Sequence, residues 1–306
     1  MAAGAAGIEP SKVRMHILKS GGGFGRRATP DSDITVEVAS IGKAIGWTAP
    51  VRLQWTREND MRGGRYRPAY VHRMRAGIDK DGNISGWENH IVGQSILKGT
   101  PFAGMIQNGI DATSVEGADH IPYAVGDITV GLTTTDVQVP VLWWRSVGHT
   151  HTAYTTETMI DQLAEAAGKD PVDFRLNLMK DHPRHAAVLK LAAEKAGWGK
   201  ALPAGRQFGV AVHESFATFV AQVAEVSMAD GEVVVHRVTA AVDCGQAINP
   251  DTVKAQLEGG IAFGLGAILQ AELTLAAGEV EQGNYDSYLP LRIDRMPEVD
   301  VPILAN

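Results

Sequence analysis

A glycine-rich stretch near the start of the chain, GGGFGRR over residues 21–27, constrains the fold more than any other feature. It follows an alternating run, Val13, Met15 and Ile17, that predicts a strand, and it precedes a segment at 31–45 with apolar residues at helical spacing. Four glycines in five residues allow positive φ angles and a close approach of the backbone to a ligand, with N–H groups exposed to an anion. The pattern predicts a strand, a ligand-binding loop and a helix.

Two interpretations of this loop stay open on composition alone. Glycine-rich turns between strands and helices are common, and Arg26 and Arg27 could simply be solvated. Alternatively, the two arginines supply fork-shaped donors suited to phosphate or carboxylate. The spacing is not GxGxxG, because Arg26 stands at the last glycine position, and no GK[ST] follows as in a P-loop.

Composition excludes several classes of protein. The 306 residues, 44% of them hydrophobic, are enough for a large core, and a net charge of -7 argues against broad binding of nucleic acid or anionic membranes. A single cysteine, Cys244, excludes a disulfide framework and a four-cysteine iron–sulfur or zinc site within the chain. No apolar run approaches the roughly 18 residues of a membrane helix, and residues 1–7 lack the features of a signal peptide. We expect a cytoplasmic protein, or a periplasmic one if the complete subunit is exported.

The remaining periodicity predicts an α+β fold in two domains, divided near a linker at 202–205 into residues 1–201 and 202–306. Residues 95–123 are expected to be irregular. The predicted helices are 31–45, which should pack on a sheet, 153–167, 171–179, 186–196 and 249–269. The predicted strands are 51–55, 74–78 with 84–92 as a hairpin, 128–132, and 222–228 with 233–242 as a second hairpin.

Two polar residues outside the glycine loop are candidates for chemistry. Arg145 lies in the run WWRSVG at 143–148, where it could be a cation stacked on tryptophan, or an electrophile that stabilises negative charge developing on a substrate. Gln256 lies on a predicted helix that carries Gly259, Gly260 and Gly264, each costing roughly 1 kcal/mol relative to alanine. Such glycines suggest close approach by a backbone or ligand, and the Gln256 amide could donate to a cofactor oxygen or merely pack.

Other polar pairs are weaker candidates. His149 and His151 form the closest histidine pair, but nothing in the sequence places carboxylates beside them, and we expect no metal bound by protein ligands. His213 with Glu214, and Asp243 with Cys244, could be acid–base or nucleophile pairs, or simply polar residues at strand ends.

Several longer motifs, taken together, indicate a family. In order they are GGGFGRR at 21–27, VRLQWTRE at 51–58, DATSVEG at 111–117, WWRSVG at 143–148, DPVDFRL at 170–176, VDCGQAINP at 242–250 and QLEGG at 256–260. The chain resembles the molybdopterin-binding large subunit of the xanthine dehydrogenase and aldehyde oxidase superfamily, nearest the isoquinoline 1-oxidoreductase β-subunit branch.

The resemblance implies two molybdopterin-binding domains with mixed or antiparallel sheets and packed helices. It implies a molybdenum hydroxylase that oxidises a small N-heteroaromatic or aldehyde substrate with water-derived oxygen, its molybdenum bound by pterin sulfurs. The pterin would be the cytosine dinucleotide form, and electrons would pass to a small subunit with two [2Fe-2S] clusters. Arg145 matches the arginine beside the substrate, and the residues expected at the cofactor are Gly22, Gly23, Phe24, Gly25, Arg26 and Gln256. Ala28 stands where other branches carry a glutamate.

The chain also departs from this pattern. The family's base, a glutamate in a GxGE motif, should follow the region of Met296 to Glu298, but the sequence given stops at Asn306, and the earlier GQG segment is missing. Glu298 does not match the motif of the base. We therefore expect a fragment, a truncated product, or one half of a split subunit whose other segments lie on another chain. A non-catalytic scaffold is the alternative, and a flavin or nicotinamide dehydrogenase is disfavoured by the loop spacing.

Overall fold

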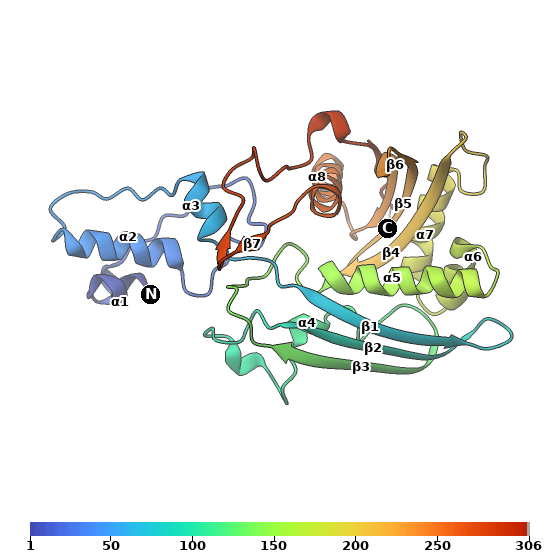
Figure 1. Ribbon diagram of the computed structural model, residues 1–306, viewed down its shortest axis with the longest axis horizontal. Coiled ribbons are helices and arrows are strands. Elements are labelled where there is room, and N and C mark those ends of the chain that lie inside the picture. Colours follow the sequence, from blue (N-terminus) through green and yellow to red (C-terminus); the bar gives the residue numbers. More distant parts are fainter. Residues whose placement is uncertain (305–306) are drawn as a thin grey trace.

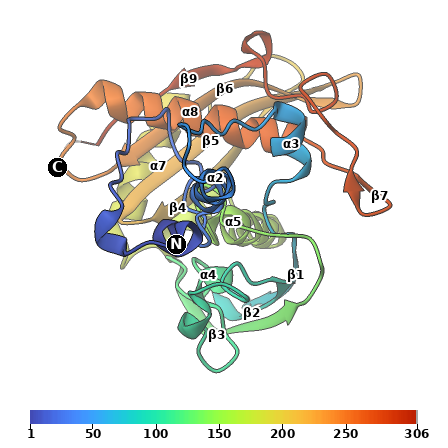
Figure 2. The same cartoon turned by 90° about the vertical axis from the view of Figure 1, so that its left-hand side faces the viewer.

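Two sheets lie on either side of a long helix in the computed structural model, which describes residues 1–304. Helix α5 runs between a lower sheet, β1–β3, and an upper sheet that contains β4–β6 (Figure 1). Helix α8 crosses above, and the N-terminal helices project from one end (Figures 1 and 2). This is the mixed α+β architecture that the sequence predicts, and it is confirmed.

The helices and strands have the following bounds. The α-helices are α1 Ala2–Ala6, α2 Asp33–Ala44, α3 Arg57–Arg62, α4 Ala112–Val115, α5 His149–Ala166, α6 Pro171–Leu178, α7 Pro183–Ala196 and α8 Pro250–Leu269. The strands are β1 Tyr70–Ile78, β2 Ile84–Gln94, β3 Val125–Thr135, β4 Arg206–Ser215, β5 Thr218–Ala229, β6 Glu232–Asp243, β7 Leu275–Ala276, β8 Glu279–Val280 and β9 Glu298–Asp300. Short 3₁₀ helices cover Pro10–Lys12, Ala103–Met105 and Ile293–Arg295.

Both predicted hairpins form. Strands β1 and β2 pair antiparallel around a turn in which Oδ1 of Asp79 accepts hydrogen bonds from the N–H groups of Asp81 and Asn83. Strands β5 and β6 pair antiparallel through Asp230 and Gly231, whose φ angles of 52° and 82° suit a tight hairpin turn. The outer strands β3 and β9 add in parallel to β2 and β6.

The core fills the space between the sheets and the helices α5, α6 and α7. Its fully buried side chains include Ile160, Phe174 and Val188, and it also buries an ion pair: Nε of Arg175 donates to Oε2 of Glu157 at 3.0 Å. The same carboxylate accepts from the N–H of Val212 on β4 at 2.8 Å. The core is thus continuous across the proposed domain division near residue 202, which remains a prediction.

Two predicted strands are wrong. Residues 13–17 and 51–55 lie outside any strand, and Ile17 is 89% exposed. Alternation shows that a segment could be half-buried in a sheet, but a strand forms only where another strand supplies hydrogen bonds. Helix α2 likewise packs on α1 and not on a sheet (Figure 1).

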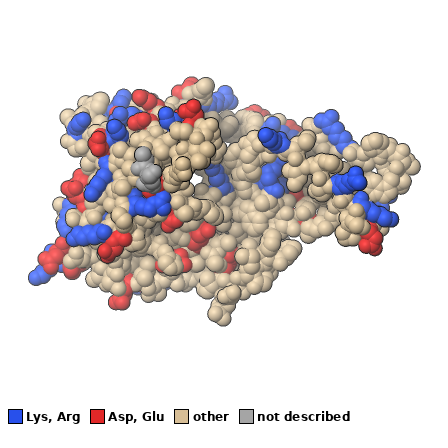
Figure 3. All heavy atoms as spheres, turned by 180° about the vertical axis from the view of Figure 1, so that it is seen from behind, with Lys and Arg blue, Asp and Glu red and all other residues tan. Residues whose placement is uncertain are grey.

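The surface has both charge signs over most of the molecule. Viewed from behind, the end that carries the N-terminal helices shows Lys and Arg with few acidic neighbours (Figure 3). No helix within residues 1–304 is long and apolar enough to cross a membrane.

Candidate functional site

The glycine loop is held against the WWRSVG segment. The backbone N–H of Arg145 donates to the carbonyl oxygen of Phe24 at 3.2 Å. Gly25 has a φ of 94°, and a Cβ added there would lie 2.2 Å from the carbonyl oxygen of Trp143. Only glycine fits at this crossing, because any side chain would collide with the backbone of the second segment.

The WWRSVG segment is itself held in an unusual conformation. Ser146 and Val147 have φ angles of 75° and 48°, a left-handed pair that costs energy for residues with side chains. The DATSVEG motif supports this turn: the carboxylate of Glu116 accepts a hydrogen bond from the N–H of Gly148 at 3.1 Å. A Cβ at Gly148 would lie 2.2 Å from the carbonyl oxygen of Thr113. The DATSVEG motif therefore holds the backbone of the WWRSVG turn in place.

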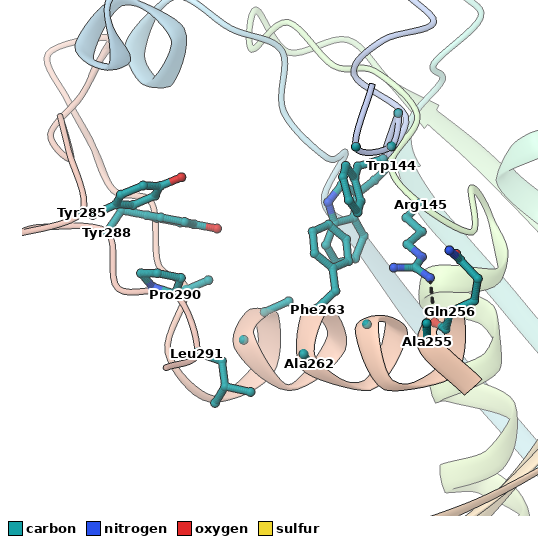
Figure 4. Close-up of a pocket in the computed structure, with 18 residues that line it drawn as sticks. Trp144, Arg145, Ala255, Gln256, Ala262, Phe263, Tyr285, Tyr288, Pro290 and Leu291 are labelled. Atoms are coloured by element: carbon teal, nitrogen blue, oxygen red, sulfur yellow. Dashed lines mark hydrogen bonds between the residues drawn. The ribbon is translucent and has the colours of Figure 1, made fainter. Parts of the chain in front are cut away.

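Helix α8 forms the opposite wall. Nη2 of Arg145 donates to the carbonyl oxygen of Gln256 at 3.2 Å, the hydrogen bond drawn in Figure 4. A Cβ at Gly260 would lie 3.4 Å from the same nitrogen, so this glycine gives the guanidinium room. The Phe263 ring lies 4.6 Å from that of Trp144 and 5.5 Å from that of Phe24, measured between centroids. Arg145 thus lies beside a small aromatic cluster.

These elements line a cavity of about 650 Å³ that is open to solvent (Figure 4). One side carries the glycine loop, another Arg145 and α8, and the far end a segment with Tyr285 and Tyr288. Within residues 1–304 the N–H groups of residues 21–25 donate no hydrogen bond, so the loop offers free donors beside the cavity. The site combines backbone donors, one arginine and aromatic surfaces, which suits a planar ligand that carries negative charge.

The structure brings most of the predicted residues together. The residues of the prediction that line the cavity are Gly22, Gly23, Phe24, Arg145 and Gln256, and Gly25 lies behind them against Trp143. Arg26 does not line it. Its Nη2 binds Oδ2 of Asp33 at 2.9 Å, which ties the loop to the start of α2.

The aromatic walls were not predicted. Trp144, Phe263, Tyr285 and Tyr288 all line the cavity. Phe263 could have been found, because it lies seven residues after Gln256 and four after Gly259, on one face of a helix. The two tyrosines lie in an irregular segment, and its sequence has no period that would place them.

The weaker candidates lie elsewhere. Nδ1 of His149 is 2.7 Å from Nε2 of His213 in a second cleft, and burial with repulsion from His149 and His185 lowers the pKa of His213 to about 4. His149 and His151 are on α5, since that helix begins four residues earlier than predicted.

In the two weaker polar pairs, His213 with Glu214 and Asp243 with Cys244, each carboxylate is bound by a group outside its pair. Asp243 accepts two hydrogen bonds from Arg184, both at 2.7 Å, and Glu214 accepts from the N–H of Ala217. In the part of the chain that the structure describes, no group of three or more His, Cys, Asp or Glu side chains is arranged to hold a metal ion.

Comparison with known proteins identifies a family. Two molybdopterin cofactor-binding domain models match, one to residues 1–179 and one to residues 151–297. The chain is 33% identical to isoquinoline 1-oxidoreductase subunit beta of Brevundimonas diminuta, over 100% of the chain and 39% of the relative. It is 31% identical to a membrane-bound aldehyde dehydrogenase (pyrroloquinoline-quinone) of Gluconacetobacter polyoxogenes, over 98% of the chain and 42% of the relative.

A solved structure has the same fold. Quinoline 2-oxidoreductase from Pseudomonas putida 86 superposes with a TM-score of 0.77 at 15% identity, over 94% of this chain and 61% of that one. The chain spans about two fifths of the length of the first two curated relatives, 39% and 42%.

Proposed function

The chain belongs to the molybdopterin-binding large subunits of the xanthine dehydrogenase and aldehyde oxidase superfamily, and we propose that its cavity holds the molybdenum–pterin cofactor of a hydroxylase. The membership confirms the resemblance that the motifs indicate. The observation that carries the proposal is the meeting of the glycine loop, Arg145 and α8 around one cavity of about 650 Å³.

The residues present fit such a cofactor. Gly22 has a φ of 120° and, with Gly21 and Gly23, is exposed, so the loop can lie flat against a ligand without side chains in the way. On the opposite wall, a Cβ added at Gly259 would meet no atom within 4 Å, which leaves open space along α8. Free N–H groups of the loop would bind the anionic edge of a pterin.

Bound molybdenum–pterin would supply the two-electron redox chemistry that places water-derived oxygen on a C–H carbon. The chain's own residues would position the cofactor and stabilise charge on the substrate. The Gln256 amide would donate to a cofactor oxygen. Arg145, fixed by the carbonyl of Gln256, would stabilise negative charge that develops on the substrate. The rings of Phe24, Trp144 and Phe263 would exclude water from the reacting carbon.

The complete enzyme would need further polypeptide. The given sequence contains no GxGE motif, and we propose that the general base comes from another segment or another chain. The single cysteine supports a separate small iron–sulfur subunit with two [2Fe-2S] clusters as the electron acceptor. We propose the cytosine dinucleotide as the form of the pterin.

A dye-linked assay tests this function. The enzyme would be purified from its native host with all its subunits, and reduction of an electron-accepting dye would be followed with quinoline, isoquinoline and quinoline-4-carboxylate in water enriched in oxygen-18. We expect one of these compounds to be oxidised and the heavy isotope to appear in its product. Dye reduction without isotope incorporation would show a dehydrogenase of a different type, and the proposal would fail.

A further inference from the structure

A second cavity of about 560 Å³ adjoins the cofactor cavity. The two share Trp144, Ala267, Ala271 and Tyr288 in their walls. Trp144 lies between the two cavities. Its ring centroid is 4.6 Å from that of Phe263, which lines the first cavity, and 4.7 Å from the guanidinium carbon of Arg67, which lines the second. A ligand in the second cavity would therefore lie next to the proposed cofactor.

The second cavity is largely apolar. Valines of the segment after β3 and aliphatic residues around the β7–β8 hairpin line it: Val137, Val139, Val141, Leu273, Leu275 and Val280. Two of its polar side chains are already engaged. The amide of Gln94 donates to the carbonyl oxygens of Val137 and Val139, both at 3.0 Å, and Arg65 binds the carboxylate of Asp31.

Arg67 differs from these neighbours. Within residues 1–304 its guanidinium forms no ion pair or hydrogen bond, and its partner is the face of Trp144. Stacking on an aromatic face leaves the N–H groups at the edge of the guanidinium free to donate in pairs to a carboxylate or phosphate. An uncompensated cation beside apolar walls favours a ligand with one anionic group.

Tyr288 adds a second donor. Its hydroxyl forms no hydrogen bond within the described residues, and burial raises the pKa of the phenol while Arg67 opposes that shift. The phenol therefore keeps its proton at neutral pH and can donate it.

We propose that this second cavity binds a planar aromatic anion, with its ring against the apolar walls and its charged group on Arg67, beside the ring of Trp144. Given the proposed function, on which this identification rests, the ligand is an acidic aromatic substrate. A phosphate of the pterin cofactor carries the same chemistry, so the test has to separate the two sources.

Calorimetric titration of the full chain without cofactor tests the proposal with 2-naphthoate and with its neutral analogue 2-naphthamide. Because the carboxylate gains charged hydrogen bonds, we expect naphthoate to bind about ten- to a hundredfold more tightly. Arg67→Gln should remove this preference, and Arg67→Lys should retain part of it. The matched control is Arg57→Gln, since Arg57 also stacks on a ring, 4.3 Å from that of Tyr285, but does not line the cavity.

Three results would overturn the proposal. Equal binding of naphthoate and naphthamide would remove the role of the charge, and naphthoate binding that survives Arg67→Gln would place the anion elsewhere. Tighter binding of inorganic phosphate than of naphthoate, lost in Arg67→Gln, would assign Arg67 to the cofactor. The titration needs no molybdenum, so its failure is distinct from failure of the hydroxylase proposal. Circular dichroism of each variant checks folding.

Discussion

At the scale of single residues, the site depends on where side chains are absent. Gly25 lets the loop cross the WWRSVG segment, and Gly260 leaves room for Arg145. The sequence predicts that a ligand or a backbone approaches these glycines closely, but it does not say which segment does so. It could not predict the ion pair between Arg26 and Asp33, which depends on the path of the loop after Gly25.

Gly25→Ala should therefore destabilise the protein. Its φ of 94° and the 2.2 Å distance from the added Cβ to the Trp143 oxygen force the two segments apart. Backbone strain of this kind costs about 1–3 kcal/mol, to which the collision adds. Urea unfolding measures the loss.

Gly21→Ala is the control for this variant. Gly21 is in the same loop, but its added Cβ would meet nothing within 4 Å, so its free energy of unfolding should change by no more than about 0.5 kcal/mol. If the two variants were equally stable, the loop would not be held against Trp143 as described.

At the scale of elements, local turn chemistry decides what the sequence predicts well. The first hairpin forms where Asp79 begins a tight turn, and the second where Asp230 lies within one. Helix α8 begins at the predicted Asn249-Pro250. The segments at 13–17 and 51–55 have the alternation typical of strands, but no strand within residues 1–304 pairs with them. The sequence of a segment does not show whether a pairing strand lies beside it. The position of α8 against Arg145 could not be predicted either, because it is set by packing across 111 residues of sequence.

Removing the cap of α8 should weaken the wall of the site. Oδ1 of Asn249 accepts a hydrogen bond from the N–H of Thr252 at 3.1 Å. Asn249→Ala loses this bond and should lower the free energy of unfolding by about 1 kcal/mol, whereas Asn249→Asp keeps an acceptor and should stay near wild type. Denaturant titrations of both variants measure the difference. An aspartate variant as unstable as the alanine variant would show that the cap does not matter.

At the scale of the whole molecule, the two sheets and α5 form one scaffold for the site. Glu157 links α5, α6 and β4 through Arg175 and Val212, so the predicted division near residue 202 runs through a continuous core. The sequence predicted the α+β class because it follows from periodicity. It did not predict this junction, since burial of a charged pair depends on neighbours distant in sequence.

Buried histidines should make the fold sensitive to acid. Burial lowers the pKa of His185 and His213 to about 4 and that of His151 to about 3, against 6.5 for an unperturbed histidine. As the pH falls from 6.5 toward 4, the unfolded chain binds protons that the folded chain excludes, and stability is lost in that window.

His213→Gln removes one of these groups while keeping a polar side chain beside His149. The loss of stability between pH 7 and pH 5 should shrink by about 1–2 kcal/mol relative to wild type. Urea unfolding at both pH values measures it. The same pH dependence in variant and wild type would mean that His213 does not carry the effect.

The central claim is that the cavity between the glycine loop and α8 holds the cofactor, and cofactor content tests it most directly. Gly259 lines the cavity and Gly264, on the same helix, does not, while a Cβ at either would meet nothing within 4 Å. Molybdenum and pterin would be measured per chain in the enzyme purified with all its subunits, as wild type, Gly259→Phe and Gly264→Phe. We predict stoichiometric molybdenum and pterin in wild type and in Gly264→Phe, and loss of both in Gly259→Phe. Full cofactor content in Gly259→Phe, or none in the wild-type complex, would contradict the claim.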